Sequence, residues 1–478
     1  MAHSKLALLL AATATAAMVA AAPADAKSSQ TKAVTDTPAV LPQVENEGWW
    51  RAFGDPVLDR IVATVLAQNC DLQAASARID QARAAAGYAR ANLLPSANLS
   101  ASAQRVSQSL ESPIGAAGAA LGLPRAFDLY QAGGEASWEV DLFGRLGRER
   151  RAALSDLGAA THTAAAIRLS LASEAAAAYV ELRRLQASLA IAEAQVANAE
   201  KTAELVRLKV DNGFAPARAL DQAVARRDEA RAALPGLRAA IAAQADRIDV
   251  LMGRTAGSAR AELAGGGGAL AAIPAAIDPG ADTVPAYLMR RRPDVIAAEQ
   301  HMLAADDRVA VALKEYYPRI SLGGLLGMVT LGISNMFTGD SVQAAGGVSL
   351  RWRLFDFGRI DAEVALARGR HAEALAMYRG VMVQATADVE TALTDLGEAR
   401  QALATRQQQV AALTAARDRT SAAYREGDVA LLDVLAAEQD VLAATQQFAA
   451  ARARVAQASV FAVRALGGGL GQEENDHG

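Results

Sequence analysis

The sequence predicts a mainly α-helical chain that also carries strands of a membrane β-barrel, arranged as a tandem structural repeat. Hydrophobic residues make up 52% of the 478 residues but aromatic residues only 4%, so alanine, leucine and valine supply most of the apolar content. That composition favours helices. The chain also repeats itself, and each repeat holds two segments in which apolar and polar residues alternate, which is the pattern of a two-faced strand.

The first 26 residues are predicted to be a signal peptide. Lys5 precedes an apolar run from Leu6 to Ala22, and the small-residue cleavage site Ala24-Asp25-Ala26 follows. A membrane-spanning helix is the alternative, but this run lies near the lower length limit for one. We expect residues 27–55 to form an extended N-terminal segment. Because Cys70 is the only cysteine, an exported chain would have no disulfide framework.

Charge and hydropathy exclude two classes of protein. The formal net charge is −4 and no basic patch occurs, so we expect no nucleic acid partner. After the N-terminal run, no segment has about 18 uncharged apolar residues in succession, which excludes a helical membrane protein. A mature chain that enters a membrane would therefore use strands.

Matching residues at two fixed spacings reveal the tandem repeat. Two pairs of residues are 223 positions apart and further pairs are 214 apart. The pairs are Asp71 and Asp294, Pro95 and Pro318, Trp138 and Trp352, and Gly213 and Gly427. Repeat 1 is assigned to residues 56–264 and repeat 2 to 281–467, with a Gly/Pro linker at 265–280 and a tail at 468–478. The linker's glycine run is no phosphate loop, because the chain has no Gly-Lys dipeptide.

Both repeats show the same order of expected elements. A helical segment comes first and ends before a proline, which disfavours helix in the residue preceding it. A β-hairpin follows, then a long helix that would span roughly 100 Å, a glycine turn and a return helix. In repeat 1 we expect the first helix at about 56–92, the hairpin at 95–142, the long helix at 144–211 and the return helix to end at 252. In repeat 2 the same elements are expected at about 281–316, 318–356 and 358–426, with the return helix ending at 466.

The expected strands indicate a shared barrel. Strands of about 11 residues with one apolar and one polar face match a tilted membrane crossing. One chain supplies four of them, and an open sheet edge in lipid leaves backbone groups unsatisfied. Two chains would give a barrel filled by its own side chains, whereas three give 12 strands and room for water. We therefore predict a trimer, with Trp138 and Trp352 at the bilayer interface.

Seven motifs, spread through nearly the whole mature chain, carry a family resemblance. They begin at Trp49, Trp138, Leu251, Arg291, Tyr317, Tyr424 and Arg464 and read WWRAFGDP, WEVDLFGR, LMGR, RRPDV, YPRISL, YREG and RALGGG. With these motifs the chain resembles the TolC-type outer-membrane efflux channels, in the NodT/OprM-like branch that serves resistance-nodulation-division pumps. The resemblance implies a homotrimer in outer-membrane lipid, with its helical barrel in the periplasm, docked to a periplasmic adaptor (membrane fusion) protein and an inner-membrane pump.

The resemblance also implies a gate at the periplasmic tip. Asp433 matches a position in a ring of carboxylates, and Tyr424 and Asp221 match a pair that hydrogen-bonds between neighbouring coils. The turns at Gly213 and Gly427 would contact the adaptor. Val429 and Ala436 replace an arginine and a carboxylate of the family pattern, which implies fewer ties and a weaker ring.

We expect no catalytic residue, cofactor or metal site. His162, His301 and His371 are isolated in the sequence, and no His-Glu-x-x-His motif occurs. The predicted function is a passive outer-membrane exit duct for drugs, toxic compounds or metal ions, as in multidrug resistance. Two alternatives remain open here: an exit duct for type I protein secretion, and a periplasmic coiled-coil structural protein.

Overall fold

The computed structural model describes residues 48–122, 124–264, 272–278 and 291–468. By internal contacts the chain divides into Met1–Pro42 and Gln43–Gly478, and all described residues belong to the second unit. The expected signal peptide, the linker's glycine run and nearly all of the tail lie outside the described residues.

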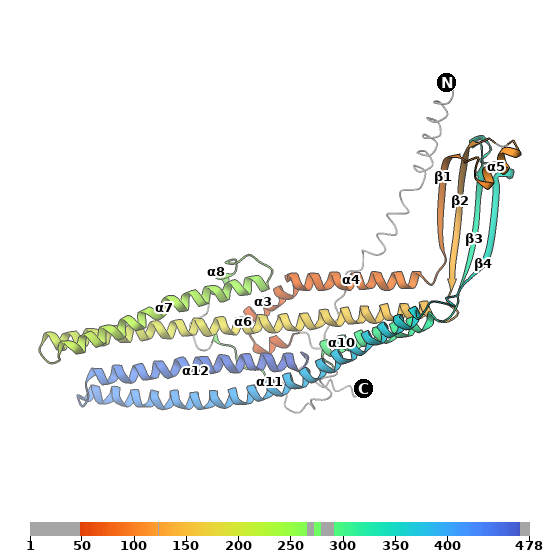
Figure 1. Cartoon of the computed structure of the whole chain (residues 1–478). Coiled ribbons are helices and arrows are strands. Elements are labelled where there is room, and N and C mark those ends of the chain that lie inside the picture. The colour runs from red at the N-terminus through yellow and green to blue at the C-terminus, as the bar shows by residue number, and fades with distance from the viewer. Residues whose placement is uncertain (1–47, 123, 265–271, 279–290, 469–478) are drawn as a thin grey trace, which may run out of the picture. The chain divides into compact units, whose positions relative to one another are not determined.

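The described elements occur in the same order in both halves of the chain (Figure 1). Each half has a helix, two strands, a very long helix and a shorter return helix. The first half holds η1 (Trp49–Phe53), α3 (Pro56–Gln68), α4 (Cys70–Ala91), β1 (Ser96–Ser107), α5 (Pro113–Ala120), β2 (Ala126–Val140), α6 (Arg145–Asp211), α7 (Ala217–Leu251) and α8 (Arg260–Ala264). The second holds α10 (Pro293–Lys314), β3 (Arg319–Thr330), η3 (Ile333–Asn335), η4 (Gly339–Ser341), β4 (Val342–Arg351), α11 (Arg359–Glu426) and α12 (Leu431–Ala465).

The helical stretch expected at 56–92 is divided at Asn69 into α3 and α4. The Asn69 side chain accepts a hydrogen bond from the backbone N–H of Asp71 at 2.8 Å, as a helix N-cap does. Its amide also donates to the carbonyl of Leu251 at 2.9 Å. The break at Asn69 therefore lets this side chain bond to Leu251 at the end of α7, far away in the sequence.

Glycines bound the two long helices. α6 has 67 residues and α11 has 68, and each follows a glycine in the left-handed region, Gly144 at φ 72° and Gly358 at φ 82°. The turns after them contain Gly213 and Gly427, at φ 77° and 89°. A residue with a Cβ would be strained in this conformation. Among the described residues, no helix is both long enough and apolar enough to span a membrane.

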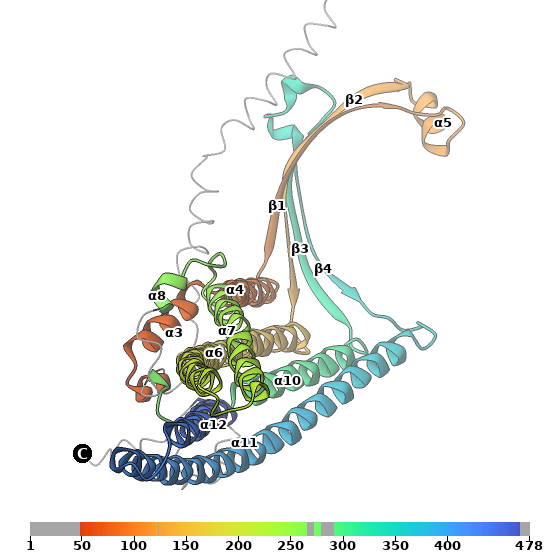
Figure 2. The same cartoon turned by 90° about the vertical axis from the view of Figure 1, so that its left-hand side faces the viewer.

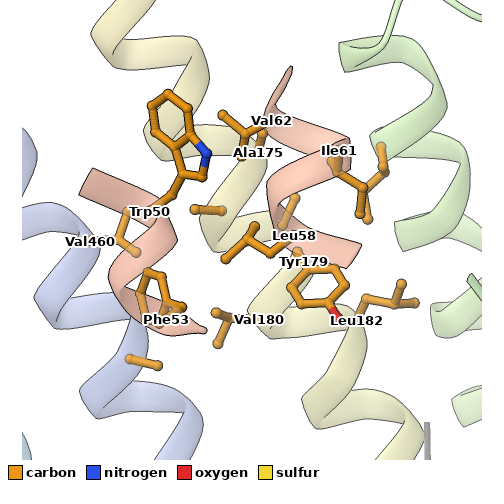
Figure 3. Close-up of a cluster of buried hydrophobic side chains, with 14 of the residues drawn as sticks. Trp50, Phe53, Leu58, Ile61, Val62, Ala175, Tyr179, Val180, Leu182 and Val460 are labelled. Carbon is orange, nitrogen blue, oxygen red and sulfur yellow. The ribbon is translucent and has the colours of Figure 1, made fainter. Parts of the chain in front are cut away.

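The main hydrophobic core surrounds the middle of α6. Figure 3 shows Leu58 and Val62 of α3, Tyr179 and Leu182 of α6, and Val460 of α12 in this cluster, and all five are buried. Trp50 and Phe53 of η1 pack into the same cluster. A second core joins α11 to α12 through Val389, Leu396 and Ala462. Small alanine side chains let these helices approach closely.

The four strands form one antiparallel sheet in the order β1-β2-β3-β4. Figure 2 shows that β2 is strongly curved. The register joins the apolar faces expected for the separate strands into one: Leu99 lies opposite Gly134, Gly134 opposite Leu326, and Leu326 opposite Ala344. Both ends of the chain's sheet, β1 and β4, pair on one side only within the described residues.

Candidate functional site

The face of the sheet opposite the apolar one is polar. Glu135 lies between Asn98 of β1 and Leu325 of β3. Four residues closer to the helices, Glu139 lies opposite Ser321, and Ser321 lies opposite Ser349. Gly133 and Gly327 also face each other here, and a Cβ on Gly133 would come within 2.8 Å of the Gly327 Cα. Serine, asparagine and glutamate side chains can be hydrated, so this face is suited to contact water.

The two predicted interface tryptophans occupy equivalent places in the two repeats. The Trp138 indole N–H donates to the carbonyl of Leu93 at 2.9 Å, and that of Trp352 donates to the carbonyl of Tyr316 at 3.0 Å. Both carbonyls lie two residues before the proline that directly precedes a strand. Each indole therefore fastens the end of a return strand to the preceding helix-to-strand junction, in addition to any contact with lipid.

Charged residues concentrate at the helix end of the polar face. Arg353 makes ion pairs with Glu315 and, at 3.0 Å, with Glu363. The hydrogen bonds that Arg353 donates to these two carboxylates raise the pKa of Arg353, and the Arg353 guanidinium lowers the pKa of Glu363. Arg319 pairs with the same Glu315 and lies directly opposite Arg351 in the register.

The two helical turns have the same hydrogen-bond geometry. In the first, the N–H of Phe214 donates to the carbonyl of Lys209 at 2.7 Å; in the second, the N–H of Asp428 donates to the carbonyl of Ala423 at 2.9 Å. Gly213 and Gly427 lie inside these turns, as the motif requires. Phe214 is 83% exposed, so the first turn presents an aromatic side chain to its surroundings.

The predicted gate residues all lie near these turns. Asp221 is in the second turn of α7 and Tyr424 in the last turn of α11, and both side chains are exposed. Asp433 is in the first turn of α12, where its carboxylate accepts the backbone N–H of Ala430 at 2.9 Å. Figure 1 places both turns at the same end of the helices.

A small cluster brings two of these residues near each other. Leu220, next to Asp221, and Leu432, next to Asp433, pack against one core that includes Val206 of α6. Within the described part of this one chain, no hydrogen bond joins Tyr424 to Asp221.

Sequence reasoning missed a group of basic residues around the start of α6. Arg148, Arg150 and Arg151 line a cavity together with Lys314 of α10. The signal that could have indicated them is the arginine-rich run directly after the strand that ends at Val140. Over the described ranges, no group of three or more His, Cys, Asp or Glu side chains is placed to hold a metal ion.

Comparison with known proteins relates this arrangement to a family. The family described as outer membrane efflux protein matches residues 61–254 and 285–468, one stretch in each repeat. The pyoverdine export outer membrane protein OpmQ of Pseudomonas aeruginosa is 32% identical over 432 residues, which cover 88% of this chain and 87% of OpmQ. The toluene efflux pump outer membrane protein TtgF of Pseudomonas putida is 28% identical over 435 residues, 88% of this chain and 85% of TtgF.

A solved structure agrees with the sequence comparisons. The outer-membrane channel OprN superimposes with a TM-score of 0.78 at 28% identity, over 91% of this chain and 96% of OprN. Because the superposition covers 91% of this chain, it includes both long helices and strands. The chain therefore belongs to the outer membrane efflux protein family, and it is an exit duct of the outer membrane rather than an enzyme.

Proposed function

We propose that three copies of this chain close into one barrel of twelve strands, continued through the periplasm by a barrel of helices. The two unpaired sheet edges support this proposal. Within the described residues, β1 pairs only with β2 and β4 only with β3. In lipid such edges leave backbone groups unsatisfied at several kcal/mol each, and pairing β4 of one chain with β1 of the next removes that cost.

The number of chains follows from pore size. Two copies would give eight strands, and the side chains inside such a barrel fill its interior. Three copies give a wider barrel in which the polar face, with Glu135 and Glu139, would line water while the apolar face meets lipid. A duct needs that aqueous interior, which favours the trimer.

The duct would complete a tripartite pump. Its proposed partners are a periplasmic adaptor protein, which would contact the turns at Gly213 and Gly427, and an inner-membrane pump that supplies the energy. Relatives whose names refer to pyoverdine export and toluene efflux support small molecules as cargo. We propose drugs, toxic compounds or metal ions, with selection made by the pump. Type I protein secretion is not favoured by these relatives.

The proposed gate lies between neighbouring chains at the helical turns. Tyr424 of one chain would donate a hydrogen bond to Asp221 of the next, because both side chains are exposed and unbonded to each other within one chain. Three Asp433 carboxylates would form a ring on the three-fold axis. Like charges at such a constriction concentrate cations, as acidic rings do in other channels.

Cysteine crosslinking tests the proposed trimer. In a Cys70→Ala background, Ser100→Cys on β1 is combined in turn with Gln343→Cys, Ala345→Cys or Gly347→Cys on the same face of β4. Because each chain then carries a cysteine on both edges, oxidation at the correct register links chains head to tail. We expect a covalent trimer on a denaturing gel. Bands no larger than a covalent dimer at every register would contradict the proposal.

Charge removal at Asp433 tests the gate. Asp433→Asn keeps an oxygen that can accept the Ala430 N–H, so it changes charge without removing the helix cap. We expect lower cation preference in planar-bilayer recordings. Asp228→Asn, which removes an exposed carboxylate paired with Arg227, is the matched control. Equal selectivity of the two variants would show that Asp433 does not face the pore axis.

A further inference from the structure

A cavity of about 1060 Å³ lies between the start of α6 and the end of α10, directly after β2 and before β3. Four of its lining residues are basic and none is acidic: they are Arg148, Arg150, Arg151 and Lys314. Such a concentration of cations in one concave site is suited to an anionic group.

The carboxylates that are bonded to lining residues of this cavity include Asp307 and Asp141. Asp307 accepts a hydrogen bond from Arg148 at 2.8 Å and lies 3.5 Å from Arg151. Asp141 accepts the backbone N–H groups of Leu146 and Gly147 at 3.0 and 2.7 Å. Within the described ranges, Arg150 and Lys314 make no ion pair with any carboxylate, so two positive charges per chain remain uncompensated.

Aromatic side chains form one wall of the cavity. The rings of Phe143 and Tyr317 stack with their centroids 4.9 Å apart, and the Lys314 Nζ lies 5.3 Å from the Tyr317 centroid. Both rings remain partly exposed, Phe143 at 37% and Tyr317 at 47%. Aromatic rings beside cations are typical of the region where lipid headgroups meet acyl chains.

The cavity opens on the same side as the apolar face of the sheet. A second cavity on α10 is lined by Arg308, Ala312 and Glu315 together with Arg319 and Arg353, which belong to the polar face. The α10 residues of the basic cavity are Ala310, Leu313 and Lys314. At about 100° per residue these two sets point to opposite sides of the helix.

Neighbouring chains would leave the basic cavity open. α6 and α10 of the same chain form its walls, and within the chain α4 packs beside α6 and α11 beside α10. A neighbouring chain would pair at β1 and β4, and thus beside α4 and α11. The cavity therefore lies in the middle of each chain's outer surface.

We infer that this cavity binds the phosphate of an anionic phospholipid in the periplasmic leaflet of the outer membrane. The inference rests on the proposed barrel, whose apolar face ends at Val140 and Ile320 just above the cavity. The acyl chains would lie against that face, the glycerol beside Phe143 and Tyr317, and the phosphate between Arg150 and Lys314. Each chain of the trimer would hold one such lipid.

Native mass spectrometry of the full chain tests this inference. The protein is purified into phosphatidylethanolamine nanodiscs and titrated with phosphatidylglycerol, and lipids retained on the assembly are counted. We expect one phosphatidylglycerol per chain. Arg150→Gln combined with Lys314→Gln should weaken binding by about 25-fold, since each cation near an anionic lipid contributes about fivefold. Arg370→Gln with Arg379→Gln removes two exposed α11 cations and should leave binding unchanged.

Further arms distinguish the possible results. Arg150→Lys with Lys314→Arg keeps both charges and should retain the lipid, which separates lost charge from altered packing. Excess inorganic phosphate should not displace phosphatidylglycerol; displacement would show a free-phosphate site and overturn the lipid assignment. Equal retention by the charge-removed and control variants would also overturn it while the proposed trimer stands. An assembly whose mass is not that of a trimer would overturn both.

Discussion

The hydroxyl group of Tyr179 is predicted to hold the N-terminal helices onto α6. This fully buried side chain donates to Asp55 Oδ2 at 2.6 Å and accepts from Arg183 Nε at 2.9 Å. Burial and the hydrogen bond to Asp55 raise the pKa of Tyr179, so the hydroxyl keeps its proton at neutral pH. Asp55 also caps α3, because it accepts the N–H of Val57 at 2.8 Å.

Tyr179→Phe removes this hydroxyl and little else. The ring stays packed against the neighbours seen in Figure 3, and Arg183 keeps its bond to Gln186 at 2.9 Å. A hydrogen bond to a charged group contributes about 1.5–3 kcal/mol, more than a neutral one. We therefore expect local opening of η1 and α3 to become about 10- to 150-fold more frequent.

Hydrogen exchange of the α3 amides measures this opening. Asp55→Ser completes a double-mutant cycle, since serine can still cap α3 but is too short to reach Tyr179. The two substitutions should be coupled by about 1–3 kcal/mol. Amides of the distant turn around Gly213 are the internal control. Additivity to within about 0.5 kcal/mol, or equal acceleration at Gly213, would refute the reasoning.

Three further predictions concern the sheet and the second repeat. Gly133→Ala should lower the heat-dissociation temperature of the purified oligomer, because its Cβ would meet Gly327 Cα at 2.8 Å and Leu326 O at 3.0 Å, at a cost of about 1–3 kcal/mol. Gly347→Ala, with no atom within 4 Å, is the control, and equal shifts would contradict this. Trp138→Phe should lower the free energy of unfolding, measured by thermal denaturation, by about 1 kcal/mol. Trp352→Phe should lower it by less, because Trp352 is 50% exposed, and a larger loss at Trp352 would contradict this prediction. Burial acts to raise the pKa of Asp294, but the hydrogen bonds and charge of Arg292 outweigh it and lower the pKa. Its stabilising effect is then present above the ordinary pKa near 3.8 and is lost as pH falls through the lowered value, so acid titrations of wild type and Asp294→Asn should converge at low pH.

The alternation of apolar and polar residues predicts the strands well, because strands pair in the register that keeps their apolar residues on one face. Alternation along the sequence places Leu99, Leu326 and Leu350 on the apolar faces of three separate strands, and in the paired sheet they share one face. The sequence pattern does not predict α5, because Pro-Ile-Gly-Ala-Ala-Gly-Ala-Ala has two glycines and no helical period of polar residues. The division at Asn69 depends on a carbonyl 182 positions away, which no local pattern contains.

The candidate site also has parts that follow from local sequence and parts that depend on residues distant in sequence. Glycine turns at Gly213 and Gly427 could be read from the sequence, because only a left-handed residue completes such a turn. The cap made by Asp433 is also local, because its carboxylate accepts an N–H only three residues away. The basic cavity could not be predicted, because it forms only when the start of α6 packs against the end of α10, and the lining residues of these two segments are more than 150 positions apart in sequence.

In the two repeats, equivalent backbone carbonyls at the ends of α7 and α12 accept hydrogen bonds from different types of side chain. In the first, the amide of Asn69 donates to Leu251 at 2.9 Å; in the second, Arg292, at the position 223 residues later, donates to Ala465 at 3.2 Å. Arg292 also pairs with Asp388 of α11 at 3.1 Å, so it ties α10, α11 and α12 together at one point. These contacts hold the ends of α7 and α12 that lie far from their turns. The residues of the proposed gate, Asp221, Tyr424 and Asp433, lie near the opposite ends of the helices, so opening of that gate would not require the sheet to move.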